Sequence, residues 1–418
     1  MTIPLLFGAC ESFWPETKEF LREMVLTNSF STNPVGVNRV GGQVAAQFQP
    51  LGFTASTAPH RLADYGDHLI LRSAAADGPT VALIAHLDTV FPEQEEERNA
   101  FRWREVGTRI HGPGTNDMKG GIAMIHLVLS VLRRHAPQIF HSTNWTILCN
   151  ACEEVDSEDF GVLCRAALPP QTLACLIFEP DGGNTSEFSL VTARKGRATF
   201  QIDVEGRSAH AGSQHARGAS AIVQLCRVIE TVEARTCYEK ALTVNVGTIS
   251  GGQVLNRVPE SASARLEMRA SSTEVFEEEK RFLLSLNGDG DLASRDAHPH
   301  RCRIHVTQLD ETPPWPKNPA SESLFALWKD AAREMSLGVK AESRGGLSDG
   351  NVLWDWAPTL DGLGPEGDHA HCSTHDPAEG KEQEFVETSS FFTKATLNVI
   401  ALCKLLMPSS LEDQLTRR

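Results

Sequence analysis

Three short apolar runs, each followed by residues that can bind a metal ion, constrain this chain more than any other feature. The runs span residues 81–85, 145–149 and 173–178. Strands buried on both faces of an α/β sheet are continuously apolar, and ligands bind beyond the carboxyl ends of such strands. The side chains that follow the three runs are His86 and Asp88, Glu153 and Glu154, and Glu179. The pattern predicts an α/β fold with a hydrolytic metal centre at one edge of its sheet.

The first of these motifs pairs an imidazole with a carboxylate two residues further on. On an extended chain, His86 and Asp88 point to the same side. We expect His86 to give one ring nitrogen to a metal while Asp88 accepts the N–H of the other, which fixes the tautomer. A buried histidine beside a strand-ending aspartate, without a metal, is the alternative that these two residues leave open.

The second motif is a pair of adjacent glutamates. Neighbouring side chains on a strand diverge, so one carboxylate can bind metal while the other faces the water to be activated. We assign Glu154 to the metal and Glu153 to the general base. The alternative is a solvated acidic turn, because Asp156 and Glu158 follow closely.

A third candidate, Asp117, lies between glycine-rich segments and precedes an apolar stretch at 122–132 that is typical of a helix. A carboxylate has two oxygens with which to bridge a pair of metals about 3.5–4 Å apart, and glycines allow close backbone approach. An aspartate that merely caps the helix is the competing interpretation, and it predicts no metal dependence.

These motifs continue in a fixed order along the chain. Ser-Ala-His-Ala-Gly stands at 208–212, Gly-Gly-Leu-Ser-Asp-Gly at 345–350, and several histidines follow near 370. As an ordered set, the motifs resemble those of the zinc exopeptidases and deacylases typified by glutamate carboxypeptidase, acetylornithine deacetylase, succinyl-diaminopimelate desuccinylase and aminoacylase. The likeness runs from about residue 80 to the C-terminal region.

The resemblance implies a pair of zinc ions and a general base. The implied ligands are His86, Asp117 and Glu179 for one zinc, and Asp117, Glu154 and a C-terminal histidine for the other. Asp117 would bridge the two ions, and Glu153 matches the base. Carboxylate-rich sites also accept cobalt or manganese, so the ligands do not fix the metal.

Three further residues match positions of a smaller lid domain in such enzymes. His210 would polarise the scissile carbonyl, often from the partner subunit of a dimer, while Asn256 and Arg269 would hold the oxyanion and a terminal carboxylate. An arginine fork suits a carboxylate because it binds in a bidentate manner. From the residues alone, a turn histidine and a solvated strand-edge arginine remain the alternatives.

The C-terminal ligand has to be chosen among three histidines. The spacing from Gly364-Pro365 favours His371, with His369 as the second choice, and a His-rich surface tract is the alternative. Family members reach an acidic-aromatic-valine element soon after this ligand, whereas here Phe385-Val386 follows a polar stretch at 376–384. We therefore expect a longer loop beside the site.

The length of 418 residues indicates two domains rather than one core. We expect an α/β, mixed-sheet catalytic domain of the zinc-exopeptidase type at 1–194 and 306–418. An inserted, smaller α+β sandwich at 195–305 would serve as a lid and dimerisation domain. Its predicted elements are strands at 198–204, 242–249, 262–270 and 302–306, helices at 219–232 and 273–286, and a polar turn at 287–291. Two more helices are predicted in the catalytic domain, at 321–334 and 388–406.

Charge and cysteine content exclude several functional classes. A formal net charge of −15 argues against nucleic-acid binding, which needs clustered lysine and arginine. No run approaches the ~20 apolar residues of a membrane helix, and the N-terminus lacks a secretory pattern. Ten scattered cysteines suit a reducing cytoplasm. We therefore expect a cytoplasmic protein, a homodimer through its lid.

The expected activity is hydrolysis of an amide bond next to an amino acid that bears a carboxylate, as in a carboxypeptidase or dipeptidase. The substrate would be a small peptide or an N-acyl amino acid. A deacylase of N-acetyl or N-succinyl amino acids is the alternative within the enzymes. A non-catalytic binding protein on the same scaffold is the alternative outside them.

Overall fold

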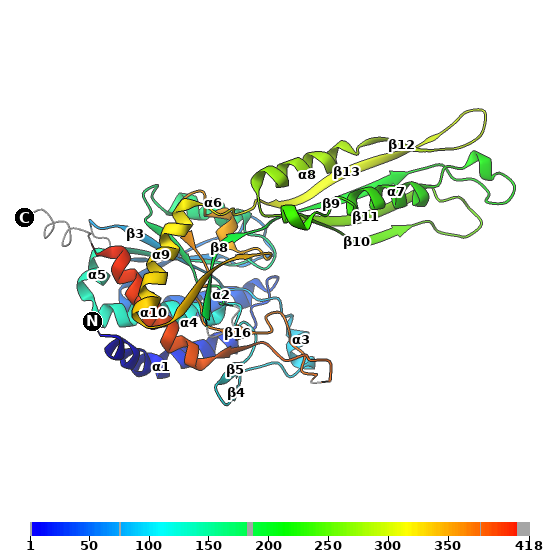
Figure 1. Ribbon diagram of the computed structural model, residues 1–418. Helices are drawn as coiled ribbons and strands as arrows, with labels where there is room; N and C mark the ends of the chain where they lie inside the picture. Colours follow the sequence, from blue (N-terminus) through cyan, green and yellow to red (C-terminus); the bar gives the residue numbers. More distant parts are fainter. Residues whose placement is uncertain (1, 75–76, 182–186, 377, 408–418) are drawn as a thin grey trace, which may run out of the picture. The chain divides into compact units, whose positions relative to one another are not determined.

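The structure is a computed structural model that describes residues 2–74, 77–181, 187–376 and 378–407. The described residues form two compact units (Figure 1). Unit 1 takes its residues from Met1–Thr192, Lys317–Ser343 and Ser348–Arg418, and unit 2 from Ala193–Pro316 and Arg344–Leu347. Each unit has hydrophobic core clusters of its own.

A six-stranded mixed sheet lies at the centre of unit 1. Its strand order is β1-β2-β6-β3-β7-β15. The strands are β1 Phe53–Ala58, β2 His68–Ser73, β3 Thr80–His86, β6 Asn144–Asn150, β7 Ala174–Ile177 and β15 Thr359–Leu360. β6, β3, β7 and β15 are parallel, whereas β1 and β2 are antiparallel to their neighbours. The three apolar runs therefore form adjacent parallel strands.

Helices cover both faces of this sheet, as the alternation along β3 shows. Val81, Leu83 and Ala85 pack into one core cluster, and Ala82 and Ile84 into another, because successive side chains of a strand point to opposite faces. Residues of six helices join the first cluster: α1 Ile3–Val25, α2 Pro34–Phe48, α4 Lys119–His135, α5 Pro137–Ser142, α9 Pro319–Glu334 and α10 Thr388–Leu406. On the opposite face lies α6 Glu158–Ala167. The helices predicted at 321–334 and 388–406 are confirmed as α9 and α10.

The helix predicted at 122–132 is α4, which is buried from Lys119 through Leu132. A helix that is apolar all round belongs in the interior of a large core, and α4 packs against α1 and α10. In the described part of the chain, no helix has the length and apolar character needed to cross a membrane.

A small four-stranded sheet of order β16-β17-β5-β4 brings the C-terminal segment to the glycine-rich loop. Phe385 of β17 pairs with His111 of β5, just before that loop. The strands are β4 Arg104–Val106, β5 Arg109–His111, β16 Gly367–Asp368 and β17 Phe385–Glu387. Unit 1 also contains α3 Glu93–Arg98 and the short 3₁₀ turns η1 Gln49–Leu51 and η4 Asp349–Val352. The strands β8 Glu187–Arg194 and β14 Gly338–Arg344 begin in unit 1 and end with residues of unit 2.

Unit 2 is an antiparallel sheet with helices on one face (Figure 1). Its strand order is β10-β11-β9-β13-β12. Along β9, the side chains from Ala198 to Val204 are buried at every second position, which is the pattern of a strand with one covered face. The elements are β9 Gly196–Glu205, α7 Ala221–Glu233, β10 Thr243–Gly251, β11 Ser261–Ala270, α8 Thr273–Ser285, β12 Gly288–Ala293, β13 Arg301–Thr312, and the turns η2 His215–Arg217 and η3 Tyr238–Lys240.

The polar turn predicted at 287–291 is wrong. The segment belongs to β12, an edge strand that pairs with β13 only in part, at Gly288, Asp289 and Ala293. An edge strand has one row of backbone groups open to solvent, so charged residues and glycine are tolerated there. Glycine and aspartate alternate in this segment, so the strand lacks the apolar pattern that would have predicted it.

Candidate metal centre

The predicted ligands converge because parallel strands end at the same edge of a sheet. In the pairing of β3 with β6, His86 lies opposite Asn150, the last residue of β6. His86 belongs to two groups of candidate ligands, one with Asp117 and Glu154 and the other with Glu153 and Glu179. Within each group, the potential ligand atoms lie within 4.8 Å of one another. Four of the predicted carboxylates are therefore gathered around the buried imidazole of His86.

Asp117 lies between two histidines. One of its oxygens, Oδ1, is 2.9 Å from Nε2 of His86, and the other, Oδ2, is 3.4 Å from Nε2 of His371. His371 is also 3.2 Å from Oε2 of Glu154, and His86 is 3.7 Å from Oε1 of Glu179. A carboxylate that turns one oxygen to each side suits the bridging position of a two-metal site.

His371 rather than His369 reaches these carboxylates. The ring of His369 lies beside Glu382, whose Oε2 is 3.9 Å from Nε2 of His369. The ring of His369 also lies 6.1 Å from that of Phe385. His371 is therefore the histidine of this segment that the fold brings to Asp117.

The orientation of His86 is set by Asp88, mainly through the backbone. Nδ1 of His86 lies 3.0 Å from the main-chain oxygen of Asp88 and 3.3 Å from its carboxylate Oδ1. Both neighbours are acceptors, so Nδ1 donates and Nε2 is the nitrogen available to a metal. The sequence predicted the carboxylate as the acceptor, but the carbonyl oxygen is the closer partner.

The Asp88 carboxylate has a second task that the sequence did not reveal. It accepts a hydrogen bond from the Ser31 hydroxyl at 2.6 Å and from the backbone N–H groups of Glu153 and Glu154 at 3.0 and 3.3 Å. Asp88 therefore ties the two glutamates to the end of β3. The glutamates lie in a turn beyond β6 and not on a strand, so the predicted reason for their divergence is wrong.

The cluster of carboxylates is electrostatically unfavourable without a cation. Burial, together with repulsion from Glu179 and Glu154, raises the pKa of Glu153 well above its usual range. Burial and repulsion from Asp117 raise the pKa of Glu154 to about 7. Burial works against ionisation of Asp117 too, but hydrogen bonds from His371 and His86 lower its pKa. Two divalent ions would relieve this repulsion.

The hydrogen bonding of one buried oxygen, Oε1 of Glu154, indicates whether a metal ion fits the cluster. Oε1 of Glu154 is buried and has no hydrogen-bond partner among the described residues. A buried carboxylate oxygen without a partner is costly, and a cation would satisfy it. The donors are imidazole nitrogens and carboxylate oxygens, which zinc, cobalt and manganese accept. The residues present therefore fit the predicted pair of metal ions.

Glu384 is a site residue that the sequence analysis missed. Its Oε1 accepts the backbone N–H groups of Asn116 and Asp117 at 2.8 and 3.2 Å, and burial and repulsion from Asp117 raise its pKa to about 8. Glu384 thus fixes the loop that carries Asp117. Its position directly before Phe385-Val386 was the available signal, because this completes an acidic-aromatic-valine element.

The three predicted substrate-contacting residues lie in unit 2. The backbone joins two of them, because the N–H of Ala211, next to His210, donates to the carbonyl oxygen of Asn256 at 2.9 Å. Nδ1 of His210 accepts the backbone N–H groups of Gly212 and Ser213 at 3.1 and 3.2 Å. The proton of the neutral ring therefore lies on Nε2, which leaves His210 an exposed hydrogen-bond donor.

Arg269 has partners within unit 2. Its Nε lies 3.0 Å from Oε1 of Glu267, and its NH1 group donates to the carbonyl oxygen of Gly345 at 2.9 Å. A substrate carboxylate would have to share this guanidinium with Glu267.

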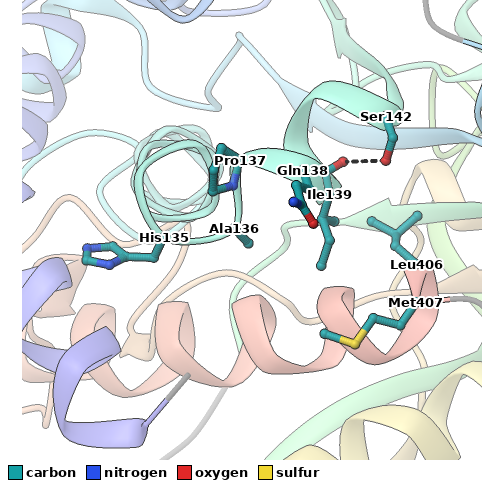
Figure 2. Close-up of a pocket in the computed structure, with 8 residues that line it drawn as sticks. All are labelled: His135, Ala136, Pro137, Gln138, Ile139, Ser142, Leu406 and Met407. Atoms are coloured by element: carbon teal, nitrogen blue, oxygen red, sulfur yellow. Dashed lines mark hydrogen bonds between the residues drawn. The ribbon is translucent and has the colours of Figure 1, made fainter. Parts of the chain in front are cut away.

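A cavity of about 600 Å³ in unit 1 contains none of the predicted site residues (Figure 2). Its lining residues are His135, Ala136, Pro137, Gln138, Ile139, Ser142, Leu406 and Met407. His135 supplies the only titratable side chain among them. This lining offers none of the carboxylates that hydrolysis at a metal centre requires.

An imidazole and carboxylate cluster with a candidate base defines the class of metal-dependent hydrolases. The model of peptidase family M20/M25/M40 matches residues 82–398, and the chain belongs to this family. The predicted resemblance is therefore confirmed, and the protein is a metal-dependent hydrolase.

Relatives within the family include both peptidases and deacylases. The chain is 25% identical to carboxypeptidase G2 of Pseudomonas sp. over 371 residues, which cover 87% of this chain and 85% of that one. It is 28% identical to acetylornithine deacetylase of Erwinia tasmaniensis over 278 residues, 61% of this chain and 68% of that one.

A solved structure confirms the predicted fold class, a mixed α/β fold. Aminopeptidase PepT from Bacillus cereus superposes with a TM-score of 0.71 at 20% sequence identity, covering 94% of this chain and 98% of that one.

Proposed function

We propose that this chain is a di-zinc hydrolase that cleaves the amide bond next to an amino acid with a free α-carboxylate, as a carboxypeptidase or dipeptidase does. One observation carries the proposal: Asp117 lies between His86 and His371, with Glu153 in the same cluster. The peptidase assignment is favoured because the match to carboxypeptidase G2 covers 87% of the chain, against 61% for the deacylase.

The ligands of the two ions would be His86, Asp117 and Glu179 for one, and Asp117, Glu154 and His371 for the other. Zinc bound there would supply Lewis acidity, which lowers the pKa of water and polarises a carbonyl oxygen. His86 would bind through Nε2, because its Nδ1 donates to Asp88.

Glu153 would act as the general base. In the metal-free cluster its pKa is well above the usual range, because it is buried among other carboxylates. Bound cations would lower that pKa, and a carboxylate beside them can both accept and return a proton. Glu153 would take the proton of the attacking water and then deliver it to the nitrogen of the leaving amine.

Residues of unit 2 would orient the substrate in this proposal. His210 would donate its Nε2 hydrogen to the scissile carbonyl, which its tautomer allows. Asn256 would support the oxyanion and Arg269 the terminal carboxylate. The segment 195–305 would form a lid over the site, and two copies of the chain would form a homodimer through this segment. The proposal also includes a cytoplasmic location, which is supported by ten cysteines that are all free.

The second candidate is an N-acyl-amino-acid deacylase, favoured by the match to acetylornithine deacetylase. A panel assay on metal-reconstituted protein separates the two candidates. The panel contains dipeptides, N-acetyl and N-succinyl amino acids, and the same compounds with the carboxylate converted to an amide.

We expect turnover of dipeptides with a free carboxylate and at least tenfold lower kcat/KM for the amides, roughly the free energy of one hydrogen bond to a charged group. Preference for acyl amino acids would favour the deacylase. No turnover of any compound, with metals bound, would support the non-catalytic binding protein.

A further inference from the structure

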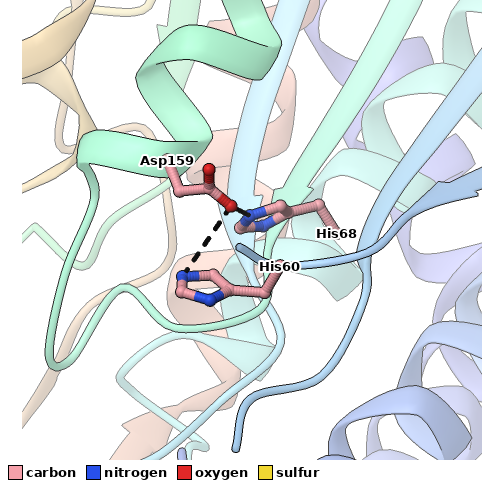
Figure 3. Close-up of side chains that lie close together, drawn as sticks. All are labelled: His60, His68 and Asp159. Atoms are coloured by element: carbon pink, nitrogen blue, oxygen red, sulfur yellow. Dashed lines mark hydrogen bonds and ion pairs between the residues drawn. The ribbon is translucent and has the colours of Figure 1, made fainter. Parts of the chain in front are cut away.

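A second cluster of histidine and carboxylate side chains lies in unit 1, outside the metal centre. It consists of His60, His68 and Asp159 (Figure 3). Nε2 of His68 is 3.3 Å from Oδ2 of Asp159, and Nε2 of His60 is 3.9 Å from the same oxygen. Both imidazoles are buried and point their Nε2 atoms at one carboxylate.

His68 connects this cluster to the turn that carries the predicted base. Its Nδ1 accepts the backbone N–H of Ala151 at 3.1 Å, in a buried hydrogen bond between residues 83 positions apart. Ala151 directly follows β6 and stands two residues before Glu153. The imidazole is therefore a fixed acceptor at the first residue of the turn.

Asp159 sets the state of the His68 ring. Because Nδ1 accepts a hydrogen bond, the proton of the neutral ring lies on Nε2, where Asp159 accepts it. Asp159 is held in turn by the backbone N–H of Arg61 at 2.9 Å. This chain of hydrogen bonds runs from Arg61 through Asp159 and His68 to Ala151.

Two histidines and an aspartate could bind zinc, but the hydrogen bonds of His68 argue against it. Histidines that bind metal donate an N–H from the other ring nitrogen. Here Nδ1 of His68 accepts the backbone N–H of Ala151. A metal on Nε2 of His68 would leave that ring without any proton, so the geometry fits a His68 ring that donates from Nε2 to Asp159.

We propose that His68, oriented by Asp159, is a positioning residue for the Glu153–Glu154 turn. This inference rests on the proposed function of that turn. The turn is held from two sides: the Asp88 carboxylate accepts the N–H groups of both glutamates, and His68 accepts that of Ala151. Loss of either acceptor frees one end of the turn.

The test compares His68→Leu with His68→Asn, because an asparagine oxygen can occupy the place of Nδ1 and accept the same N–H. We expect His68→Leu to lower kcat roughly 10- to 100-fold with little change in KM, the range for groups that orient an active site from behind. His68→Asn should recover most of the loss. His60→Leu is the matched control, since His60 has no hydrogen bond to the turn, and it should keep the kcat of the wild type.

A second readout does not depend on turnover. Zinc titration of the metal-free protein should show weaker binding in His68→Leu, because Glu154 belongs to the same turn, and recovery in His68→Asn. If the wild type hydrolyses none of the panel compounds, the proposed function fails, while the zinc titration still tests the positioning role.

Three outcomes would overturn the inference. One is His68→Leu with the kcat and zinc affinity of the wild type. Another is a third zinc per chain that is lost in His60→Leu. The last is nitrogen NMR of the wild type showing the His68 proton on Nδ1, a measurement that requires no variant to fold.

Discussion

Two buried histidines of unit 1 face carboxylates with Nε2, yet they differ in what Nδ1 meets. Nδ1 of His86 meets an acceptor, the carbonyl oxygen of Asp88 at 3.0 Å, whereas Nδ1 of His68 meets a donor, the N–H of Ala151 at 3.1 Å. The first ring can therefore offer Nε2 to a metal, and the second carries its proton there. Residue types alone do not identify a metal site. The group that Nδ1 meets decides whether Nε2 is free to bind a metal.

The charges around the two rings also favour a metal at His86 and not at His68. His86 is surrounded by the carboxylates of Asp117, Glu153, Glu154 and Glu179. In the other cluster, one carboxylate, Asp159, faces two imidazole rings. Only the first cluster has an excess of buried negative charge that a divalent cation would neutralise.

The largest effect is expected for Glu153→Gln. Removal of a general base should lower kcat about 10²- to 10⁴-fold, while the zinc content stays at the wild-type level because Glu154 is retained. Steady-state kinetics with metal analysis measures both quantities. Glu158→Gln, an exposed change just beyond the same turn, is the control and should leave kcat unchanged. Full activity in Glu153→Gln would remove this residue from the mechanism.

The next largest effect contrasts the two carboxylates that accept from histidine. Asp117→Asn should weaken zinc binding by roughly 100-fold or more, since a shared ligand of both ions loses its charge, and loss of an outer partner alone costs 10- to 100-fold. Asp159→Asn should bind zinc with nearly wild-type affinity, because the amide oxygen of asparagine can still accept the Nε2 hydrogen of His68. Equal losses in the two variants, measured by competition with a chelating dye, would erase the difference between the clusters.

Metal removal should affect stability through the first cluster alone. With zinc at about 100 times its dissociation constant, binding stabilises the folded state by about 2.7 kcal/mol, and a chelator should remove that amount. Thermal unfolding with and without chelator measures the shift. Asp159→Asn should show the same shift as the wild type, and Asp117→Asn a much smaller one; a full shift in Asp117→Asn would contradict the assignment of the ligands.

The smallest effect is expected in the metal-free protein, where the pKa values of His68 and His86 are shifted in opposite directions and so change the pH dependence of stability with opposite sign. Burial lowers the pKa of His68 below 6.5, although Asp159 opposes this, so the unfolded chain binds the proton more readily and stability falls as pH drops below about 6.5. For His86, burial is outweighed by hydrogen bonds with Asp117 and Asp88, and the pKa is raised. Its contribution is present below about 6.5 and is lost at higher pH.

Denaturant titrations over a range of pH can detect this difference. His68→Asn should make the acid loss of stability shallower, and His86→Asn should make it steeper. His60 and Asp88 also act on His68, so the comparison uses each variant against the wild type at the same pH. If both variants changed the slope of stability against pH in the same direction relative to the wild type, the assigned directions of the pKa shifts would be contradicted.

Much of the fold follows from local patterns. The continuous apolar runs predicted β3, β6 and β7, and the periodic stretches predicted α9 and α10, because long regular segments carry a strong signal. The edge strand β12 escaped prediction, since Gly288 and Asp289 lack the apolar alternation of a covered strand. The turn that holds Glu153 was predicted as strand, because nothing in its own sequence ends β6 at Asn150.

The sequence by itself determined which residue types follow the strands, and with them the family and the candidate ligands. Only the tertiary structure decided that His371 and not His369 reaches Asp117, and that Glu384 holds the Asp117 loop. It also decided on which nitrogen His86 and His68 carry a proton. The physical reason is that a ring nitrogen takes its role from the group it meets, and for His68 that group is a backbone N–H 83 residues away in the sequence.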